Sequence, residues 1–210
     1  MKFDNLTVID HPLIQQKLCF VRDRTTPYLS FRTVLSEIGA LMVYEVTRGL
    51  PTKEREVETP LERTTGRVLA RPVTLVAILR AGIAMTDGIL RLIPYARVGH
   101  IGIYRDEETF QPVEYYLKFP PGFADSEIIV IDPMLATGGT AVAAIDKIKE
   151  HGGSSILFVC LVAAPEGVKM MQDHHPEIPL YTAALDRQLN DRAYILPGLG
   201  DAGDRIYGTQ

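Results

Sequence analysis

The sequence predicts an α/β protein with a mainly parallel central sheet flanked by helices. From residue 74, short apolar runs such as "TLVAIL", "IIVI", "ILFVCLV" and "LYTAAL" alternate with segments of helical periodicity. The runs are continuously apolar, which is typical of strands covered on both faces and joined by crossover helices. A length of 210 residues suits one domain with a substantial core, so we expect a single domain over residues 1–210.

The composition favours small-molecule chemistry in the cytoplasm. Asp and Glu number 26 against 22 Lys and Arg, so no overall basic field exists to hold nucleic acid. No apolar run approaches the length of a membrane span, and "MKFDNLTVIDHP" lacks the basic and apolar segments of a secretion signal. Cys19 and Cys160 form no C-x-x-C pair, which supports neither a disulfide framework nor a zinc site. Cys160, inside "ILFVCLV", is expected to be a reduced core residue.

The first 72 residues are expected to form N-terminal helices and an arm. The stretch "YLSFRTVLSEIGALMVYEVTRG" places apolar residues at three- to four-residue spacing and ends at Gly49, which predicts an amphipathic helix. In "TKEREVETPLERTTGRVLARP", Glu54, Glu56 and Glu58 alternate with other residues, a pattern of an exposed arm or edge strand. Such an arm could meet a second subunit.

Two segments interrupt the rhythm of the α/β core, which we place at about residues 73–190. Between Tyr104 and Ile128, "RDEETFQPVEYYLKFPPGFADSE" is too long and polar for a simple connection, so we expect a hairpin or mobile flap. His174 and His175 are adjacent, and adjacent helical positions do not face one target. We expect both histidines at an exposed helix end rather than at a metal.

The stretch "IIVIDPMLATGGTA", residues 128–141, carries the clearest chemistry. Ligands bind beyond the carboxyl ends of parallel strands, and this apolar strand ends at Asp132. Gly138 and Gly139 let a backbone approach a ligand closely, while Thr137 and Thr140 supply hydroxyl donors at the start of a helix expected over about residues 140–151. An anion site fits this pattern, and so does a plain strand-turn-helix with an Asp cap; composition alone does not separate them.

Two familiar nucleotide motifs do not apply. A P-loop needs G-x-x-x-x-G-K-[ST], and no lysine follows these glycines. The segment "GLGDAG" at residues 198–203 matches G-x-G-x-x-G formally, but the seven residues after it leave no room for a crossover helix and a distant acid.

Four stretches together resemble the type I phosphoribosyltransferases. "IIVIDPMLATGGTA" looks like their binding motif for 5-phosphoribosyl 1-diphosphate (PRPP), in which T-G-G-T surrounds the 5-phosphate. Many members have two adjacent acids, whereas this chain has Asp132 followed by Pro133. This Asp-Pro form, "LRAG" at residues 79–82, "YRDEE" and the terminal "YILPGLGDAGDRIYGT" are similar to the uracil phosphoribosyltransferase branch. The resemblance covers essentially the whole chain and implies a type I phosphoribosyltransferase-like fold with an arm or flap.

The resemblance also implies site residues. Arg80 and Arg105 would bind the diphosphate, Arg105 from the flap, while Asp132 would hold the ribose hydroxyls. With Asp201, which would face the PRPP side, these are the catalytic candidates. The full PRPP-binding set is Arg80, Arg105, Asp132, Pro133, Met134, Leu135, Ala136, Thr137, Gly138, Gly139, Thr140 and Asp201. On its own, Arg80 at a strand end before Gly82 suits a diphosphate, although a surface arginine beside a turn gives the same pattern.

The last segment, about residues 191–210, is expected to be neither a conventional strand nor a helix, because proline and glycines break both periodicities. A frayed tail is one interpretation, but Tyr194, Ile195, Leu196 and Leu199 are too apolar for a solvated tail. A glycine-rich loop anchored in this way could read a small planar base with main-chain groups. By resemblance, the uracil-binding residues are Ile195, Gly200, Asp201 and Ala202.

The resemblance implies transfer of the phosphoribosyl group from PRPP to N1 of uracil, giving UMP and diphosphate in pyrimidine salvage. Mg²⁺ would arrive with PRPP without a dedicated protein site. GTP is a possible effector, and a homodimer or homotetramer is expected, with neither nucleic acid nor a membrane as partner. Two alternatives are a PRPP-fold regulator that binds pyrimidine-operon RNA and a purine phosphoribosyltransferase. The tail "YILPGLGDAGDR" speaks against both.

Overall fold

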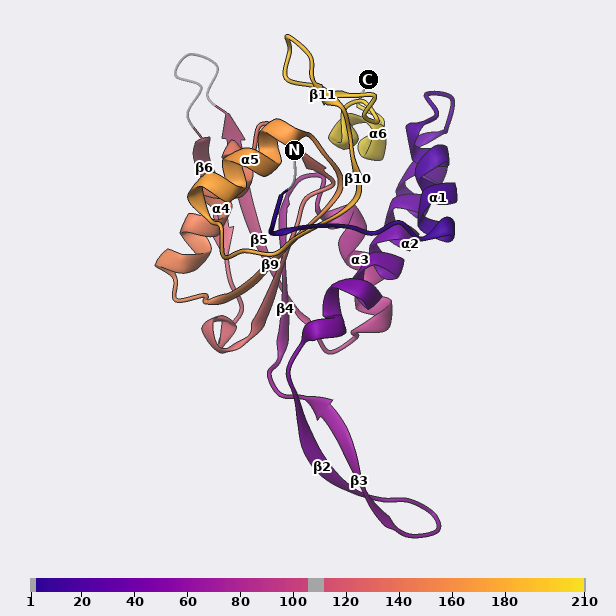
Figure 1. The fold of residues 1–210 in the computed structure, drawn as a ribbon, viewed down its shortest axis with the longest axis vertical. Coiled ribbons are helices and arrows are strands. Elements are labelled where there is room, and N and C mark those ends of the chain that lie inside the picture. Colours follow the sequence, from indigo (N-terminus) through magenta and orange to yellow (C-terminus); the bar gives the residue numbers. More distant parts are fainter. Residues whose placement is uncertain (1–2, 106–111, 210) are drawn as a thin grey trace.

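The centre of the protein is a mainly parallel sheet, as the sequence predicts (Figure 1). The computed structural model describes residues 3–105 and 112–209. The strand order is β1-β10-β9-β7-β4-β5-β6, with β8 beside β9, and within these residues the β5–β6 pair alone in this sheet is antiparallel. The strands are β1 (Leu6–Val8), β4 (Val73–Leu79), β5 (Arg97–Arg105), β6 (Pro112–Lys118), β7 (Glu127–Ile131), β8 (Met134–Leu135), β9 (Ser155–Ala163) and β10 (Leu180–Leu185).

Helices cover both faces of the sheet (Figure 1). One face packs against α1 (Pro12–Arg22), α2 (Tyr28–Val46) and α3 (Ile83–Leu92), and the other packs against α4 (Gly139–Glu150) and α5 (Pro165–His174). Strand β7 shows why its sequence is continuously apolar. Ile129 and Ile131 join the core on the α2 side, whereas Ile128 and Val130 join the core on the α4 side. None of the helices within the described ranges has the length and apolar character needed to cross a bilayer.

The predicted amphipathic helix corresponds to α2, which continues into the short 3₁₀ turn η1 (Thr47–Gly49). Its apolar stripe is fully buried, as expected for a helix that packs on a sheet. The buried stripe consists of Phe31, Leu35, Ile38, Met42 and Val46.

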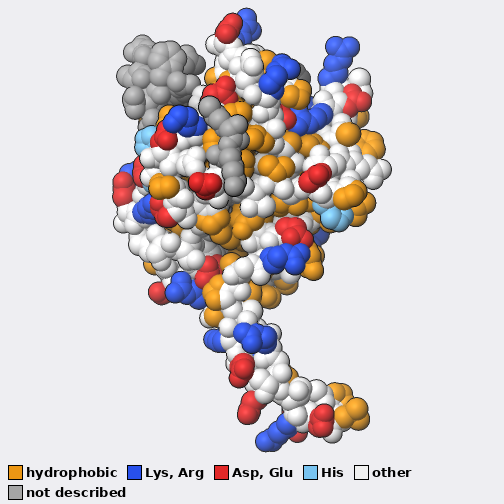
Figure 2. Space-filling model, in the orientation of Figure 1, with side chains coloured by type: hydrophobic (Ala, Val, Ile, Leu, Met, Phe, Trp, Pro, Cys, Tyr) orange, Lys and Arg blue, Asp and Glu red, His pale blue; other side chains and the backbone are white. Residues whose placement is uncertain are grey.

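The predicted arm is a two-stranded antiparallel ribbon made of β2 (Thr52–Glu58) and β3 (Arg63–Leu69). Every residue of β2 is exposed, which confirms the interpretation of its alternating glutamates. The ribbon extends away from the body at the end opposite the C-terminal segment (Figure 1). Figure 2 shows charges of both signs along the arm and hydrophobic side chains at its tip, where Leu61 is 95% exposed.

The polar segment after Tyr104 contains the expected hairpin. β5 and β6 pair in antiparallel register, with Tyr104 beside Val113, and the 3₁₀ turn η2 (Phe123–Asp125) leads into β7. The tip of the hairpin, residues 106–111, lies outside the described residues, so the predicted flap is described only at its base.

Two features differ from the sequence prediction. Strand β1 is absent from the prediction because three residues are too few to show a period, yet it pairs with β10 at the sheet edge. The expected exposure of both histidines is correct for His174 and wrong for His175, which is 5% exposed. Because α5 ends at His174, the chain turns and carries His175 inward, where its Nδ1 lies 2.9 Å from Lys149 Nζ.

Candidate active site

The candidate site lies at the ends of two neighbouring strands whose following connections run to opposite sides of the sheet. After β4 the chain passes through α3 to β5, whereas after β7 it passes through α4 to β9, on the other side of the β4–β7 pair. β4 and β7 are parallel, so their carboxyl ends open at the same edge. Such a divergence creates the crevice in which open parallel sheets bind ligands. Arg80 follows β4 and Asp132 follows β7, so the fold brings these two distant stretches to one edge.

The segment after β7 is fixed on β9 by backbone hydrogen bonds. The Asp132 N–H donates to Val159 O (3.1 Å), and the Ala164 N–H donates to Leu135 O (2.9 Å). Between these anchors, β8 pairs with β9 in parallel register. The loop therefore has a defined path before α4 begins at Gly139, one residue before the predicted start.

The start of α4 is open to an anion. Gly138 is the N-cap residue, has a φ of 87° and supplies no side-chain hydrogen bond. The first N–H groups of α4 therefore lack a capping side chain, and N–H groups in this position attract phosphate. Within the described part of the chain, the half-buried hydroxyls of Thr137 and Thr140 have no hydrogen-bond partner. The predicted loop residues thus offer several donors.

The loop also packs tightly against α5. A Cβ at Gly138 would lie 2.8 Å from Met170 Cβ and 2.9 Å from Gly167 O, and a Cβ at Gly167 would clash with the carbonyl oxygen of Ala136. Gly167 is therefore needed for the close approach, and sequence analysis missed it. Gly139 differs, because a Cβ there would meet only Thr137 Oγ1, at 4.0 Å.

This contrast between two adjacent glycines predicts separable effects. Gly139→Ala is expected to leave the melting temperature unchanged or slightly raised, since Ala suits a helix better than Gly by about 0.5–1 kcal/mol. Its methyl group would enter the space beside the Thr137 hydroxyl and obstruct a hydrogen bond from the loop to the charged phosphate of PRPP. The loss of one such bond should weaken PRPP binding roughly tenfold or more. Gly138→Ala is the matched control and should lower the melting temperature, because it combines positive φ with a clash. Calorimetric titration with PRPP and thermal melts test both, and unchanged PRPP affinity in Gly139→Ala would exclude this loop as the phosphate cradle.

Asp132 directly follows β7 in a half-buried position. Burial raises the pKa of its carboxyl group to about 7, and a hydrogen bond from the Met134 N–H to Oδ1 (3.2 Å) opposes this shift. The loop proline that follows offers no second carboxylate to share the charge. A carboxyl group with a pKa near neutrality can gain or lose its charge as ligands bind.

Arg80 lies exposed at the carboxyl end of β4, with 59% of its side chain accessible. The turn after it requires Gly82, because a Cβ there would clash with the carbonyl oxygen of Ile131 in β7. This contact places the Arg80 turn directly beside the strand that leads to Asp132. The peptide bond between Leu79 and Arg80 is cis.

The C-terminal segment is ordered and partly regular. It contains the short strands β11 (Gln188–Leu189) and β12 (Ile195–Leu196), which form a hairpin, and the helix α6 (Ala202–Tyr207). The expectation that this segment is neither strand nor helix is therefore wrong for these residues. Asp201 starts the helix, because its Oδ1 accepts a hydrogen bond from the Asp204 N–H (3.0 Å), and one glycine inside α6 does not prevent it.

Apolar anchors hold this segment on the body, as the sequence predicts for Ile195 and Leu199. Both are buried, together with Ala202 and Ile206 of α6. A frayed tail is excluded for these residues.

Charged anchors that sequence analysis missed complete the attachment. Arg22 at the end of α1 binds Asp186 with two hydrogen bonds (2.9 and 2.6 Å) and donates to Gly198 O (2.8 Å), while the Gly198 N–H donates to Asp186 Oδ2 (2.9 Å). Arg205 donates to the carbonyl oxygens of Leu199 (2.7 Å) and Asp23 (2.6 Å). The partners of Arg22, and Asp23 as a partner of Arg205, are 164 or more positions away in sequence, so no local pattern signals them.

The hairpin leaves main-chain groups of Ile195 directed away from its partner strand. The Asn190 N–H donates to Tyr194 O (2.8 Å), which makes residues 190 and 194 a hydrogen-bonded pair. In an antiparallel ladder such pairs alternate, so the next pair, Leu189 and Ile195, is not hydrogen-bonded. The N–H and C=O of Ile195 therefore point away from β11, and the carbonyl oxygen lies against Gly198, where a Cβ would clash with it.

The structure brings most of the predicted residues to one end of the sheet. α6 lies against Arg80, since Tyr207 Oη donates to Arg80 O (3.0 Å) and Arg80 Nη2 lies 3.9 Å from Asp204 Oδ1. Arg105 is the last residue of β5, the neighbour of β4, at the base of the flap hairpin. The loop after β7, the carboxyl end of β4 and the C-terminal segment thus lie at the end of the sheet opposite the arm (Figure 1).

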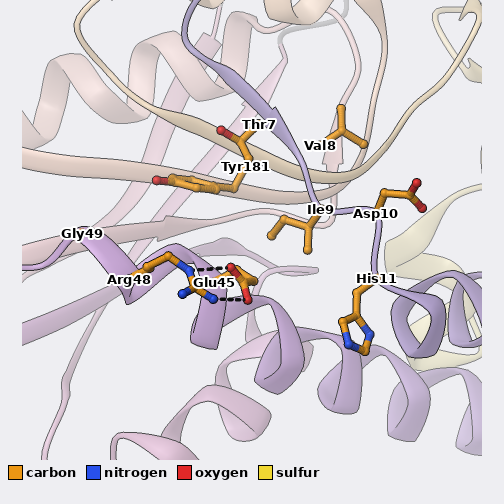
Figure 3. A pocket seen from close by; sticks show the side chains of 9 residues that line it. All are labelled: Thr7, Val8, Ile9, Asp10, His11, Glu45, Arg48, Gly49 and Tyr181. Carbon is orange, nitrogen blue, oxygen red and sulfur yellow. Dashed lines mark hydrogen bonds and ion pairs between the residues drawn. The ribbon is translucent and has the colours of Figure 1, made fainter.

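A cavity of about 560 Å³ elsewhere is a poorer phosphate site. Figure 3 shows it between the sheet edge at β1 and the end of α2, with Asp10 and His11 on one side and Glu45 and Arg48 on the other. Arg48 is already held by Glu45 through two hydrogen bonds (2.9 and 2.7 Å), so its charge is neutralised. None of the predicted site residues lines this cavity.

Comparison with known proteins decides the family. A family model described as uracil phosphoribosyltransferase matches residues 8–209. The chain belongs to the uracil phosphoribosyltransferase family. Two curated uracil phosphoribosyltransferases are similar to it: that of Geobacillus kaustophilus is 55% identical over 97% of this chain and 98% of its own length, and that of Acidovorax ebreus is 56% identical over 98% and 99%.

Solved structures agree with the uracil phosphoribosyltransferase fold. A protein from Aquifex aeolicus superposes with a TM-score of 0.92 at 36% identity, covering 98% of this chain and 99% of that one. Adenine phosphoribosyltransferase from Trypanosoma brucei reaches a TM-score of 0.58 at 11% identity over 90% and 87% of the two chains, which is a likeness of fold alone. The predicted type I phosphoribosyltransferase-like architecture is therefore confirmed.

Proposed function

We propose that this protein transfers the phosphoribosyl group of PRPP to N1 of uracil, forming UMP and releasing diphosphate, in cytoplasmic pyrimidine salvage. Membership of the uracil phosphoribosyltransferase family supports the reaction. One observation supports the place where it occurs: the loop after β7, Arg80 after β4 and the C-terminal helix meet at the point where the sheet connections diverge.

Each part of the site receives one part of the substrates. The loop from Thr137 to Thr140 and the start of α4 hold the 5-phosphate, and the Asp132 carboxylate accepts hydrogen bonds from the ribose hydroxyls. Arg80 and Arg105 bind the diphosphate, for which planar guanidinium groups are well suited. Uracil is read by main-chain groups of Ile195 and of residues 200–202. Asp201 faces PRPP with the carboxylate oxygen that does not cap α6.

The chemistry requires positioning and charge rather than a protein nucleophile. The ribose centre develops oxocarbenium character as the bond to diphosphate breaks and the bond to uracil N1 forms, while the proton of N1 leaves to the diphosphate or to solvent. Arg80 and Arg105 stabilise the negative charge that grows on the departing diphosphate. Alignment of the base over the ribose and exclusion of water supply the remaining rate enhancement.

The residues near the site fit a Mg²⁺ ion that is carried by PRPP. The carboxyl groups near the site are those of Asp132, Asp201 and Asp204. Mg²⁺ commonly keeps several waters and uses one or two carboxylates together with substrate phosphates. When bound, it would neutralise part of the diphosphate charge beside Arg80.

Diphosphate release from PRPP with a panel of free bases tests the function. We expect release with uracil and little with adenine, guanine, hypoxanthine or cytosine. Release with a purine in preference to uracil, or with none of the bases, would overturn the proposal. RNA binding is measured in the same preparation. Binding of pyrimidine-operon RNA without diphosphate release would favour the alternative of an RNA-binding regulator.

We further propose that the arm joins this chain to a second copy, within a homodimer or homotetramer. An exposed ribbon that ends in a bare Leu61 gains apolar burial only against another surface. Glu54 pairs with Arg67 in the ribbon, so joining these two through an Asn-Gly turn shortens the arm and preserves the hairpin register. The shortened protein is expected to form an assembly with fewer subunits by light scattering and to keep the far-UV spectrum of the core. An unchanged number of subunits would exclude the arm as the interface.

GTP is proposed as an effector of this enzyme. Addition of GTP to the uracil assay at subsaturating PRPP tests it, with a higher rate expected. Equal rates with and without GTP would remove this part of the proposal.

A further inference from the structure

Helix α6 presents one face to Arg80. Residues three and four apart share a helix face, and Gly203, Asp204 and Tyr207 share this one. The guanidinium carbon of Arg80 lies 5.6 Å from the centre of the Tyr207 ring, and Arg80 Nη2 lies 3.9 Å from Asp204 Oδ1. A Cβ at Gly203 would stand 3.7 Å from the same nitrogen, so the helix backbone is also close.

Tyr207 contacts Arg80 at two places. Its ring lies beneath the guanidinium group, a cation–π arrangement, and its hydroxyl donates a hydrogen bond of 3.0 Å to the Arg80 carbonyl oxygen. The same carbonyl accepts a longer bond from the Ile83 N–H (3.4 Å), at the start of α3. One side chain therefore restrains both the backbone and the charged end of Arg80. This matters because an exposed arginine otherwise loses considerable side-chain freedom when it binds a ligand.

Helix α6 is a firm support for these contacts. Ala202 and Ile206 are fully buried on another face, and Arg205 donates to the carbonyl oxygens of Asp23, just after α1, and of Leu199. The helix follows directly from the segment proposed to read uracil and ends at Tyr207. It thus connects the proposed base end of the site to the proposed diphosphate end through fewer than two helical turns.

We propose that Tyr207 is a positioning residue that holds Arg80 in place for the diphosphate of PRPP. The inference rests on the proposed role of Arg80. Before PRPP binds, the guanidinium group lies near the Asp204 carboxylate. The diphosphate then takes the place of that carboxylate, while the ring and hydroxyl of Tyr207 keep the arginine in position. Tyr207 touches neither substrate in this arrangement and acts through Arg80.

Two substitutions separate the contacts. Tyr207→Phe removes the hydroxyl and keeps the ring, and it is expected to weaken PRPP binding by about three- to tenfold, the effect of one hydrogen bond. Tyr207→Leu removes both contacts and should weaken binding by a further factor of about two to five. The KM for uracil at saturating PRPP should change less than about twofold. Tyr95→Phe, at an exposed tyrosine after α3, is the control and should behave as the wild type.

A double-mutant cycle distinguishes positioning from mere support of the fold. The Phe substitution is repeated in an Arg80→Ala background, with PRPP affinity measured by calorimetry in the presence of Mg²⁺ and with thermal melts of each protein. If Tyr207 acts through the guanidinium group, its effect disappears once that group is absent. An equal loss in both backgrounds, or no loss in the wild-type background, would overturn the inference. If Arg80→Ala itself binds PRPP normally, the proposed role of Arg80 fails, and with it this inference; a wild type inactive with every base would instead refute the proposed function.

Discussion

Asp132→Asn is expected to lower kcat/KM for PRPP by about 10²- to 10⁴-fold while the protein stays folded. The amide keeps the size of the carboxylate but loses the charge that strengthens hydrogen bonds to two ribose hydroxyls. Hydrogen bonds to a charged group contribute roughly 1.5–3 kcal/mol each, so two give about 3–6 kcal/mol. Asp125→Asn is the matched control, because Asp125 is exposed just before β7 whereas Asp132 follows its end. Wild-type kinetics in a folded Asp132→Asn protein would exclude this role.

The same substitution should stabilise the protein at alkaline pH. Burial raises the pKa of Asp132 from 3.8 to about 7, so the folded state holds its proton more tightly than the unfolded state. Stability from this group is therefore greatest at low pH and is lost as pH rises from about 4 to 7. At pH 8 the Asn variant avoids this penalty and should gain on the order of 1–3 kcal/mol, or about 3–10 °C in Tm. A Tm difference that does not grow between pH 5 and pH 8 would contradict the buried-carboxylate account.

Catalysis should follow the opposite trend with pH. In the free enzyme, the ionised form of Asp132 accepts charge-assisted bonds from both ribose hydroxyls, whereas the protonated form loses the charge and turns one oxygen into a donor, so kcat/KM for PRPP should fall as pH drops below about 7. The Asn variant should lack this limb of the profile. Loss of activity together with a gain in stability would mark Asp132 as a group retained for function at a cost to the fold.

The sequence predicted the parts of the fold whose signal is local. The strand β7 is apolar at every position because both of its faces are covered, and the loop after it carries its own turn residues and helix start. The alternating glutamates of the arm predict an exposed strand. These features depend on residues close together in the chain, so a single sequence suffices to predict them.

The remaining features depend on contacts between distant residues. The pair formed by Arg22 and Asp186 spans 164 positions, and the need for Gly167 arises only when α5 packs on the loop after β7. α6 had a local signal, since Asp201 is followed three residues later by Asp204, a pattern of helix starts. The surrounding glycines and Pro197 outweighed it in the sequence analysis, whereas burial of Ala202 and Ile206 decides the structure.

The preference for uracil over cytosine is expected to be large, because main-chain groups cannot rotate to suit another hydrogen-bonding pattern. Uracil presents acceptor, donor and acceptor at O2, N3–H and O4. Cytosine keeps O2 but presents an acceptor at N3 and a donor at its amino group, so two contacts fail together. If each buried mismatch costs roughly 1–3 kcal/mol, kcat/KM should differ by about thirty-fold to more than ten-thousand-fold. Equal values for the two bases would refute the main-chain reading.

A glycine substitution in the base-reading segment tests the same idea through the protein. Gly200 has a φ of 80° and room for a methyl group, with Arg205 Cδ 3.4 Å from a built Cβ, so Gly200→Ala perturbs the backbone rather than the packing. Gly152→Ala is the matched control, since Gly152 has a φ of 89° and a 3.4 Å contact but lies after α4, away from the site. Both variants should lose a similar, modest amount of stability, on the order of 1 kcal/mol, from strain at positive φ. Only Gly200→Ala should lower kcat/KM for uracil and reduce the ratio of kcat/KM for uracil to kcat/KM for cytosine. Only at this position does the strained backbone carry the groups that are proposed to read the base. If the two variants retain the same ratio as the wild type, the base is read elsewhere, and the segment from Ile195 to Ala202 serves only to support α6.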